Sequence, residues 1–168
     1  MKARTLGAVN ANAEILVIMD SHVEVAPGWL PPLLLPIVKN PHTITLPGID
    51  PLGVNNLKYV DAIWENYEYV GGFTWELMYT WTAHHPKPLD SHTPVPSPTM
   101  MGACFAIRKD YFEYLGYYDD GFELWGGENL ELSFKVWMCG GRMLHTFCSH
   151  VAHMYRNRPY WVGKKIYF

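Results

Sequence analysis

The feature that most constrains the fold is an uninterrupted apolar run over residues 15–19, which ends at Asp20, Ser21 and His22. A run without alternation of polar and apolar residues is typical of a strand that is covered on both faces. Such strands are commonest in parallel sheets flanked by helices. We therefore predict an α/β domain, Rossmann-like, with a mostly parallel central sheet flanked by helices.

The rest of the chain supports an alternation of strands and helices. Residues 3–12 are expected to form the end of a helix, and further helices are expected over residues 109–115 and 128–138. The segment 27–40 is also expected to be helical, although Pro36 would kink or end that helix. Further strands are expected over residues 43–46, 103–107 and 144–147. Residues 47–98 carry repeated Pro and Gly with scattered aromatic residues, which predicts a long, partly ordered functional loop region.

Composition narrows the class of protein. The 168 residues suit one domain, and 49% of them are hydrophobic. The net charge of -3 leaves no basic field for nucleic acid. The longest apolar run is far shorter than the roughly 20 residues of a membrane span, so we expect no membrane contact from this segment. Cys104, Cys139 and Cys148 include no CxxC pair, which argues against a structural zinc site.

Asp20 and His22 form the first candidate site. In open α/β sheets ligands bind beyond the carboxyl ends of the strands, where both residues fall. Side chains two residues apart in an extended segment point the same way and can share one ion. A carboxylate with an imidazole suits Mn²⁺ or another first-row divalent ion better than Ca²⁺. Alternatively, Asp20 caps the next helix and His22 lies on the surface.

The segment SHVAHMYRNRPYW near the end of the chain offers a second group of polar residues. His150 and His153 follow a predicted strand, and Arg156, Arg158 and Tyr160 lie just beyond. A metal ion together with arginines suits a diphosphate, because guanidinium groups pair with phosphate oxygens. The alternative is a basic, solvated tail that contains a buried histidine.

The segment LWGGENLELSF offers a third group. Gly126 and Gly127 precede a predicted helix whose first turn carries Glu128 and Asn129, and acidic groups are favoured there by the helix dipole. The glycines permit close backbone approach, so Glu128, Asn129 and Trp125 are candidates for holding the hydroxyls and one face of a sugar. Alternatively, Glu128 only completes a helix start and Trp125 belongs to the core.

Taken in order, these segments resemble the polypeptide N-acetylgalactosaminyltransferases. The resemblance rests on ARTLGA, DSHVE with GWLPPLL, GGFTWEL, PTMMGACFAIRKDYF, GYYDDGFELWGGENLELSFKVWMCGG and CSHVAHMYRNRPY. It implies a retaining enzyme of the GT-A fold that transfers GalNAc from UDP-GalNAc to Ser or Thr of a polypeptide in the Golgi lumen. It also implies a partial catalytic domain over residues 1–168: the N-terminal nucleotide-binding strands, the membrane anchor and the lectin domain are expected outside this segment.

The resemblance assigns roles to individual residues. It makes Asp20, His22 and His153 the ligands of a Mn²⁺ ion on the UDP diphosphate, with His150 supporting rather than ligating. The other positions that match the donor, acceptor or loop residues of the family are Arg4, Gly102, Ala103, Trp125, Glu128, Asn129, Arg156 and Tyr160. Of these, Arg156 and Tyr160 match a loop that closes over UDP. Cys139 and Cys148 match cysteines whose disulfide partners lie elsewhere.

Two alternatives to this function follow from departures from the family pattern. The missing nucleotide-binding half suits a non-catalytic relative or inactive fragment that acts as a binding or regulatory module. Ala103 stands where a second glycine is usual and adds a methyl group beside the sugar, which suits a GT-A transferase with another sugar donor.

Overall fold

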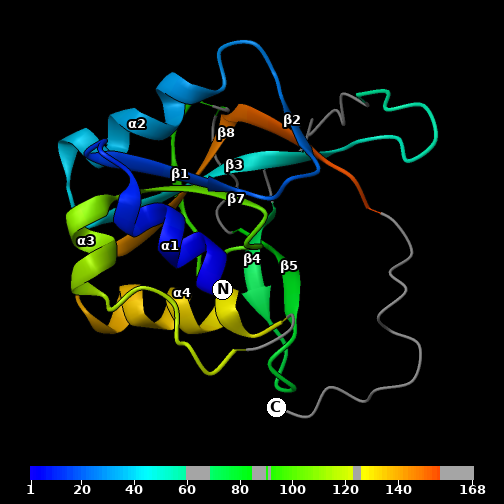
Figure 1. Ribbon diagram of the computed structural model, residues 1–168. Coiled ribbons are helices and arrows are strands. Elements are labelled where there is room, and N and C mark those ends of the chain that lie inside the picture. Colours follow the sequence, from blue (N-terminus) through cyan, green and yellow to red (C-terminus); the bar gives the residue numbers. More distant parts are fainter. Residues whose placement is uncertain (60–68, 85–89, 91, 123–125, 156–168) are drawn as a thin grey trace.

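Strand β1 (Ile15–Met19) is covered on both faces, as its apolar run predicts. Leu16 and Ile18 are buried in the main core, while Ile15 and Val17 pack toward α2 (Leu30–Lys39) on the other face. The computed structural model describes residues 1–59, 69–84, 90, 92–122 and 126–155. In this part of the chain, helices lie on both sides of the central sheet, with α2 on one side and α1, α3 and α4 on the other (Figure 1).

The sheet that contains β1 is completed by further helices and strands. Besides α2, the helices are α1 (Lys2–Asn10), α3 (Lys109–Tyr114) and α4 (Glu128–Met138). The other strands of the six-stranded sheet are β2 (Val23–Val25), β3 (Thr43–Pro51), β6 (Val95–Pro96), β7 (Cys104–Arg108) and β8 (Arg142–His153). Strands β4 (Tyr69–Phe73) and β5 (Tyr79–Ala83) form a separate antiparallel hairpin.

The sheet is mixed, so the prediction of a mostly parallel sheet was wrong for the described residues. Its order is β1-β7-β3-β8-β2, with β6 paired to β8. Within the described ranges only the β3–β8 pairing is parallel. An unbroken apolar run reports that both faces of a strand are covered, and says nothing of the direction of its neighbour. The α/β class itself is confirmed.

Pro36 does not end α2, which continues to Lys39. Leu33 and Ile37 on the inner face are completely buried against the sheet. The proline removes a single backbone donor, and this burial offsets the loss. The helices expected over 109–115 and 128–138 are confirmed as α3 and α4.

The predicted loop region over residues 47–98 contains more regular structure than expected. Strand β3 extends to Pro51, and the hairpin of β4 and β5 and the short strand β6 also fall within this stretch. Strand β8 is likewise longer than predicted and carries both His150 and His153, rather than preceding them. No helix among the described residues has the length and apolar character needed to cross a bilayer.

Candidate functional site

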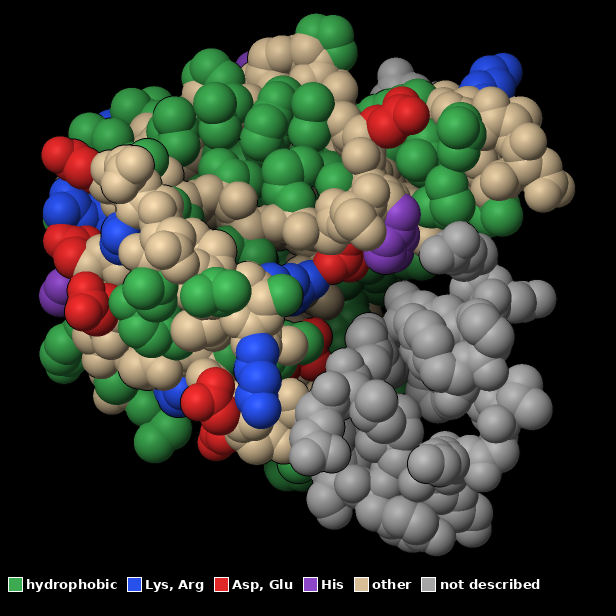
Figure 2. All heavy atoms as spheres, viewed as in Figure 1, with side chains coloured by type: hydrophobic (Ala, Val, Ile, Leu, Met, Phe, Trp, Pro, Cys, Tyr) green, Lys and Arg blue, Asp and Glu red, His purple; other side chains and the backbone are tan. Residues whose placement is uncertain are grey.

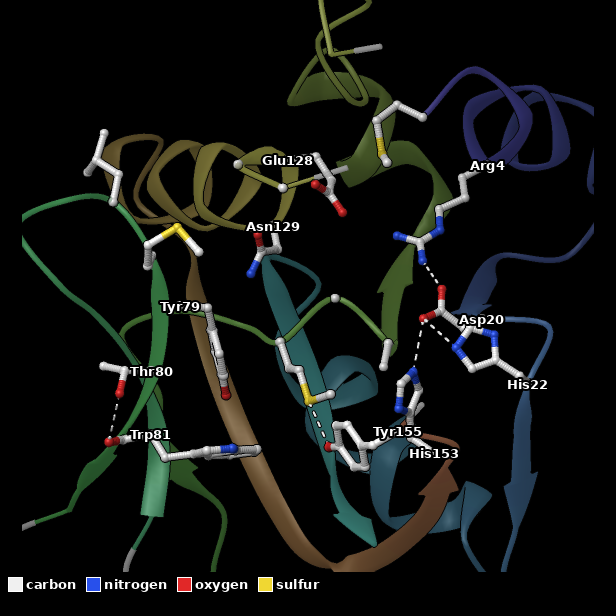
Figure 3. Close-up of a pocket in the computed structure, with 18 of the residues that line it drawn as sticks. Arg4, Asp20, His22, Tyr79, Thr80, Trp81, Glu128, Asn129, His153 and Tyr155 are labelled. Carbon is white, nitrogen blue, oxygen red and sulfur yellow. Dashed lines mark hydrogen bonds and ion pairs between the residues drawn. The ribbon is translucent and has the colours of Figure 1, made fainter. Parts of the chain in front are cut away.

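The structure brings Asp20, His22 and His153 together at one end of the sheet (Figure 3). Their ligand atoms all lie within 4.8 Å of one another. Asp20 Oδ2 lies 3.4 Å from His153 Nε2 and 4.0 Å from His22 Nε2. Two residues that are separated by a single position in sequence thus meet a third that lies more than a hundred positions away.

Backbone pairing holds these three residues in place. Asp20 follows β1, and its amide donates to the carbonyl oxygen of Ala103 at 2.8 Å. Val23 in β2 pairs with His153, the last residue of β8, and the carbonyl oxygen of His22 accepts the amide of Met154 at 3.1 Å. The turn between β1 and β2 is therefore tied to the end of β8. Because β2 and not a helix follows His22, the alternative that Asp20 caps a helix is wrong.

Arg4 adds a positive charge next to Asp20, His22 and His153. Its guanidinium pairs with Asp20 Oδ1, which leaves Oδ2 directed at the two histidines (Figure 3). Burial raises the pKa of Asp20, but the hydrogen bond with His153 and the positive charge of Arg4 outweigh burial and hold the pKa below its ordinary value. Asp20 is therefore ionised at neutral pH. Figure 2 shows basic, acidic and histidine side chains meeting in a hollow of the face in view.

The donor set fits a first-row divalent metal ion. Such an ion lies about 2.0–2.2 Å from nitrogen and oxygen ligands, so two of its ligands lie roughly 3–4 Å apart. The separations of 3.4 Å and 4.0 Å fall in this range. Cys104 is buried nearby, but burial and the charge of Asp20 raise the pKa of its thiol to about 12, so it remains protonated and offers no thiolate.

A pocket of about 670 Å³ opens from this group toward the start of α4. Glu128 and Asn129 line it from the first turn of the helix, where Gly126 and Gly127 adopt positive φ angles of 96° and 82°. Asn129 Nδ2 donates to the carbonyl oxygen of Met100 at 2.8 Å. Glu128 Oε2 is buried, and no described residue hydrogen-bonds to it. Glu128 thus brings a carboxylate to the pocket wall, and its Oε2 has no hydrogen-bond donor among the described residues.

Gly102 and Ala103 line the same pocket directly before β7. Gly102 has a φ of +89°, and a Cβ built there would lie 3.2 Å from Asn129 Cβ. A glycine is therefore needed at this position, both for its backbone angle and for the close approach of α4.

The opposite wall of the pocket comes from the hairpin, which the sequence did not identify as part of a site. Tyr79 and Trp81 in β5 line the pocket, with ring centroids 5.4 Å apart. Between this wall and the group of Asp20, His22 and His153, Tyr155 Oη donates to Met101 Sδ at 3.5 Å (Figure 3). The alternation of aromatic residues and threonine over residues 79–82 was the available signal, because period two is typical of a strand.

The other predicted site residues divide into two groups. Trp125, Arg156 and Tyr160 lie outside the described residues. His150 lies in β8, where its Nδ1 contacts Asp50 Oδ2 at 3.0 Å. Asp50 was not predicted as a site residue, and no local spacing links it to His150.

The chain is similar to known families, sequences and structures. Residues 1–116 match the glycosyl transferase family 2 model, and residues 87–157 match a model described as the N-terminal domain of galactosyltransferase. Polypeptide N-acetylgalactosaminyltransferase 5 of Caenorhabditis elegans is 46% identical over 168 residues, covering 95% of this chain and 26% of the relative. Polypeptide N-acetylgalactosaminyltransferase 4 of Mus musculus is 43% identical over 165 residues, covering 95% and 28%.

A solved structure has the same fold. It is described as the crystal structure of GalNAc-T7 with UDP, GalNAc and Mn²⁺, and it matches 92% of this chain with a TM-score of 0.85 and 35% sequence identity. The match covers 30% of that structure. The chain therefore spans between a quarter and a third of the length of the proteins it matches here.

Proposed function

The chain belongs to glycosyl transferase family 2, and we propose that it is the metal- and sugar-binding part of a polypeptide N-acetylgalactosaminyltransferase catalytic domain. In this proposal the enzyme transfers GalNAc from UDP-GalNAc to Ser or Thr of a polypeptide with retention. The observation that carries it is the convergence of Asp20, His22 and His153 beside a pocket that Glu128 and Asn129 line. By the same resemblance, we place the reaction in the Golgi lumen.

Asp20, His22 and His153 would hold the metal ion, for which we propose Mn²⁺. When bound, Mn²⁺ supplies positive charge that stabilises the departing diphosphate. Arg4 balances the second oxygen of Asp20 and so keeps the carboxylate oriented. The sequence resemblance adds Arg156 and Tyr160 as residues that close over UDP, and Trp125 as a residue near the diphosphate.

Glu128 and Asn129 would position the sugar. The Glu128 carboxylate would accept a hydrogen bond from a hydroxyl group of the sugar, while Asn129 is fixed by its hydrogen bond to Met100. Gly102 and Ala103 would form the surface beneath the sugar. We assign Glu128 to positioning and electrostatics and not to a covalent intermediate.

Retention is then best explained by attack on the same face of the sugar. The bond from the sugar C1 to the diphosphate oxygen breaks, and a bond from C1 to the acceptor hydroxyl oxygen forms. The acceptor proton passes to the departing diphosphate oxygen. This route needs no nucleophilic side chain of the protein.

The test is donor turnover by the full-length protein that contains this segment, with a Ser/Thr-containing peptide and Mn²⁺. We expect GalNAc transfer that Asp20→Ala abolishes, with NMR of the product giving the configuration at C1. UDP and Mn²⁺ binding without transfer or donor hydrolysis would favour the binding-module alternative. Turnover of another UDP-sugar in preference to UDP-GalNAc would favour the alternative donor, for which the methyl group of Ala103 in the pocket is the reason.

A further inference from the structure

The segment of β8 that carries His153 is not held in register by the first part of the same strand. Arg142 to Thr146 pair with Thr43 to Pro47 of β3, and pairing resumes only between His150 and Gly48. Residues 147–149 of β8 lie between these two blocks without counterparts on β3. The position of the second block, residues 150–153, therefore depends on its own contacts.

The register of this block decides where His153 points. Successive side chains of a strand face opposite sides of the sheet, so a shift of one residue would turn every side chain of the block over. His153 is 1% exposed and faces Asp20, whereas His150, three residues earlier, faces the other side. A shift would remove His153 from the metal group.

Asp50 makes a side-chain contact with this block of β8. Its side chain is completely buried, and its Oδ2 accepts hydrogen bonds from Tyr59 Oη at 2.6 Å and from His150 Nδ1 at 3.0 Å. Asp50 pairs with Ala152, so His150 is its diagonal neighbour on the same face of the sheet. One carboxylate thus joins β3, β8 and the segment after β3.

Because Asp50 is buried, its contact with His150 favours one register of the 150–153 block over a shifted one. A buried carboxylate is costly unless donors satisfy it, and a shifted block would take the imidazole of His150 away from it. We propose that Asp50, acting through His150, is a positioning residue that holds the 150–153 block in the register in which His153 reaches the metal. The metal part of this statement rests on the proposed function.

The experiment compares His150→Leu, Asp50→Asn and His150→Arg in the purified protein. Backbone amide hydrogen exchange over residues 150–153 is measured without metal, and Mn²⁺ affinity is measured by calorimetry. We expect the first two variants to exchange faster in this block and to bind Mn²⁺ about tenfold more weakly or worse. His150→Arg keeps a donor for Asp50 and should restore both quantities.

The matched control is Thr43→Val, which removes the hydrogen bond from Arg142 Nε to Thr43 Oγ1 at 3.0 Å in the first block of the same strand pair. It should speed exchange over residues 142–146 and leave Mn²⁺ affinity within about twofold. Unchanged exchange over residues 150–153 in His150→Leu would overturn the proposal, as would equal Mn²⁺ affinity in His150→Leu and the control. Failure of the parent protein to bind Mn²⁺ would defeat the proposed function, and the exchange data would still decide the role of Asp50.

Discussion

The two sides of the pocket are built in different ways. The metal side consists of Arg4, Asp20, His22 and His153, which are charged or titratable and are tied together by ion pairs and backbone pairing. The hairpin side consists of Tyr79, Trp81 and their neighbours, which meet the pocket mainly through aromatic faces. One side is organised by directional contacts, and the other by apolar packing.

This difference separates two kinds of function. Ligands of an ion must be placed to within a fraction of an ångström, whereas an apolar wall acts through area and shape. We therefore expect substitutions on the metal side to change ion affinity without large effects on folding. Substitutions on the hairpin side should change stability and substrate fit while leaving ion affinity intact.

The largest expected effect is the loss of Mn²⁺ binding in His153→Ala. Residues that only support a ligand cost 10–100-fold in metal affinity, so loss of a ligand should cost more than about 100-fold. Calorimetric titration of Mn²⁺ with UDP measures it. Chelation should likewise remove UDP binding from the parent protein.

The control for this variant lies on the opposite wall. Tyr79→Phe keeps the ring and removes only the hydroxyl group, so it should bind Mn²⁺ as the parent protein does. Equal loss of affinity in both variants would show that the two sides are not separable.

The sequence anticipated this contrast in part. The Asp20 and His22 pair could be picked out from the sequence, because a carboxylate and an imidazole two residues apart form a recognisable metal-binding pattern. The partner His153 was assigned through the family resemblance, since nothing in its spacing links it to residue 20. Asp50 was missed, because its contact with His150 exists only once β3 and β8 have paired.

The fold shows the same limit. Apolar runs and helix stop signals located β1, β7, α3 and α4, because each depends on neighbours along the chain. Strand direction and the β4–β5 hairpin depend on tertiary pairing. Frequent Gly and Pro over residues 47–98 concealed the alternation that marks β5.

The next largest effect concerns pH and stability on the hairpin side. His145 packs behind Trp81, with ring centroids 6.2 Å apart, and desolvation by burial lowers its pKa from 6.5 to about 4. The unfolded chain therefore binds a proton that the folded chain excludes, so stability is complete above pH 6.5 and is lost as pH falls toward 4. Between pH 8 and pH 5 the loss should be about 2 kcal/mol.

Denaturant unfolding at several pH values measures this loss. His145→Gln keeps a donor for the carbonyl oxygen of Pro47, which His145 Nε2 contacts at 2.8 Å, but it cannot be protonated. Its stability should fall less over the same pH range. An unaltered pH slope would mean that other groups cause the acid sensitivity.

A smaller effect is expected from Trp81→Ala. Truncation of a fully buried tryptophan costs about 3–5 kcal/mol, and the half-buried Trp81 should cost about 1–2 kcal/mol. Chemical denaturation gives the free energy of unfolding, and calorimetry under folding conditions gives Mn²⁺ affinity. A fall in Mn²⁺ affinity of more than about twofold in the folded variant would contradict the division between the two sides.

The smallest expected effect lies at Ala103, on the boundary between the two sides. Its methyl group lines the pocket, while its carbonyl oxygen accepts the amide of Asp20. Removal of one methyl group in Ala103→Gly is worth about 0.8 kcal/mol, so preference for the bulkier UDP-GalNAc over UDP-galactose should rise about fourfold. The ratio of kcat/KM for the two donors measures this preference.

Ala106→Gly is the matched control for Ala103→Gly, because Ala106 is buried in β7, the strand that Ala103 directly precedes, and packs toward α2, away from the pocket. It should lower stability without changing the donor ratio. If Ala103→Gly instead weakened Mn²⁺ binding at an unchanged donor ratio, its backbone contact with Asp20 would be its main role. Ala103 would then belong to the metal side, and residues of the hairpin side would have to discriminate between donor sugars of different size.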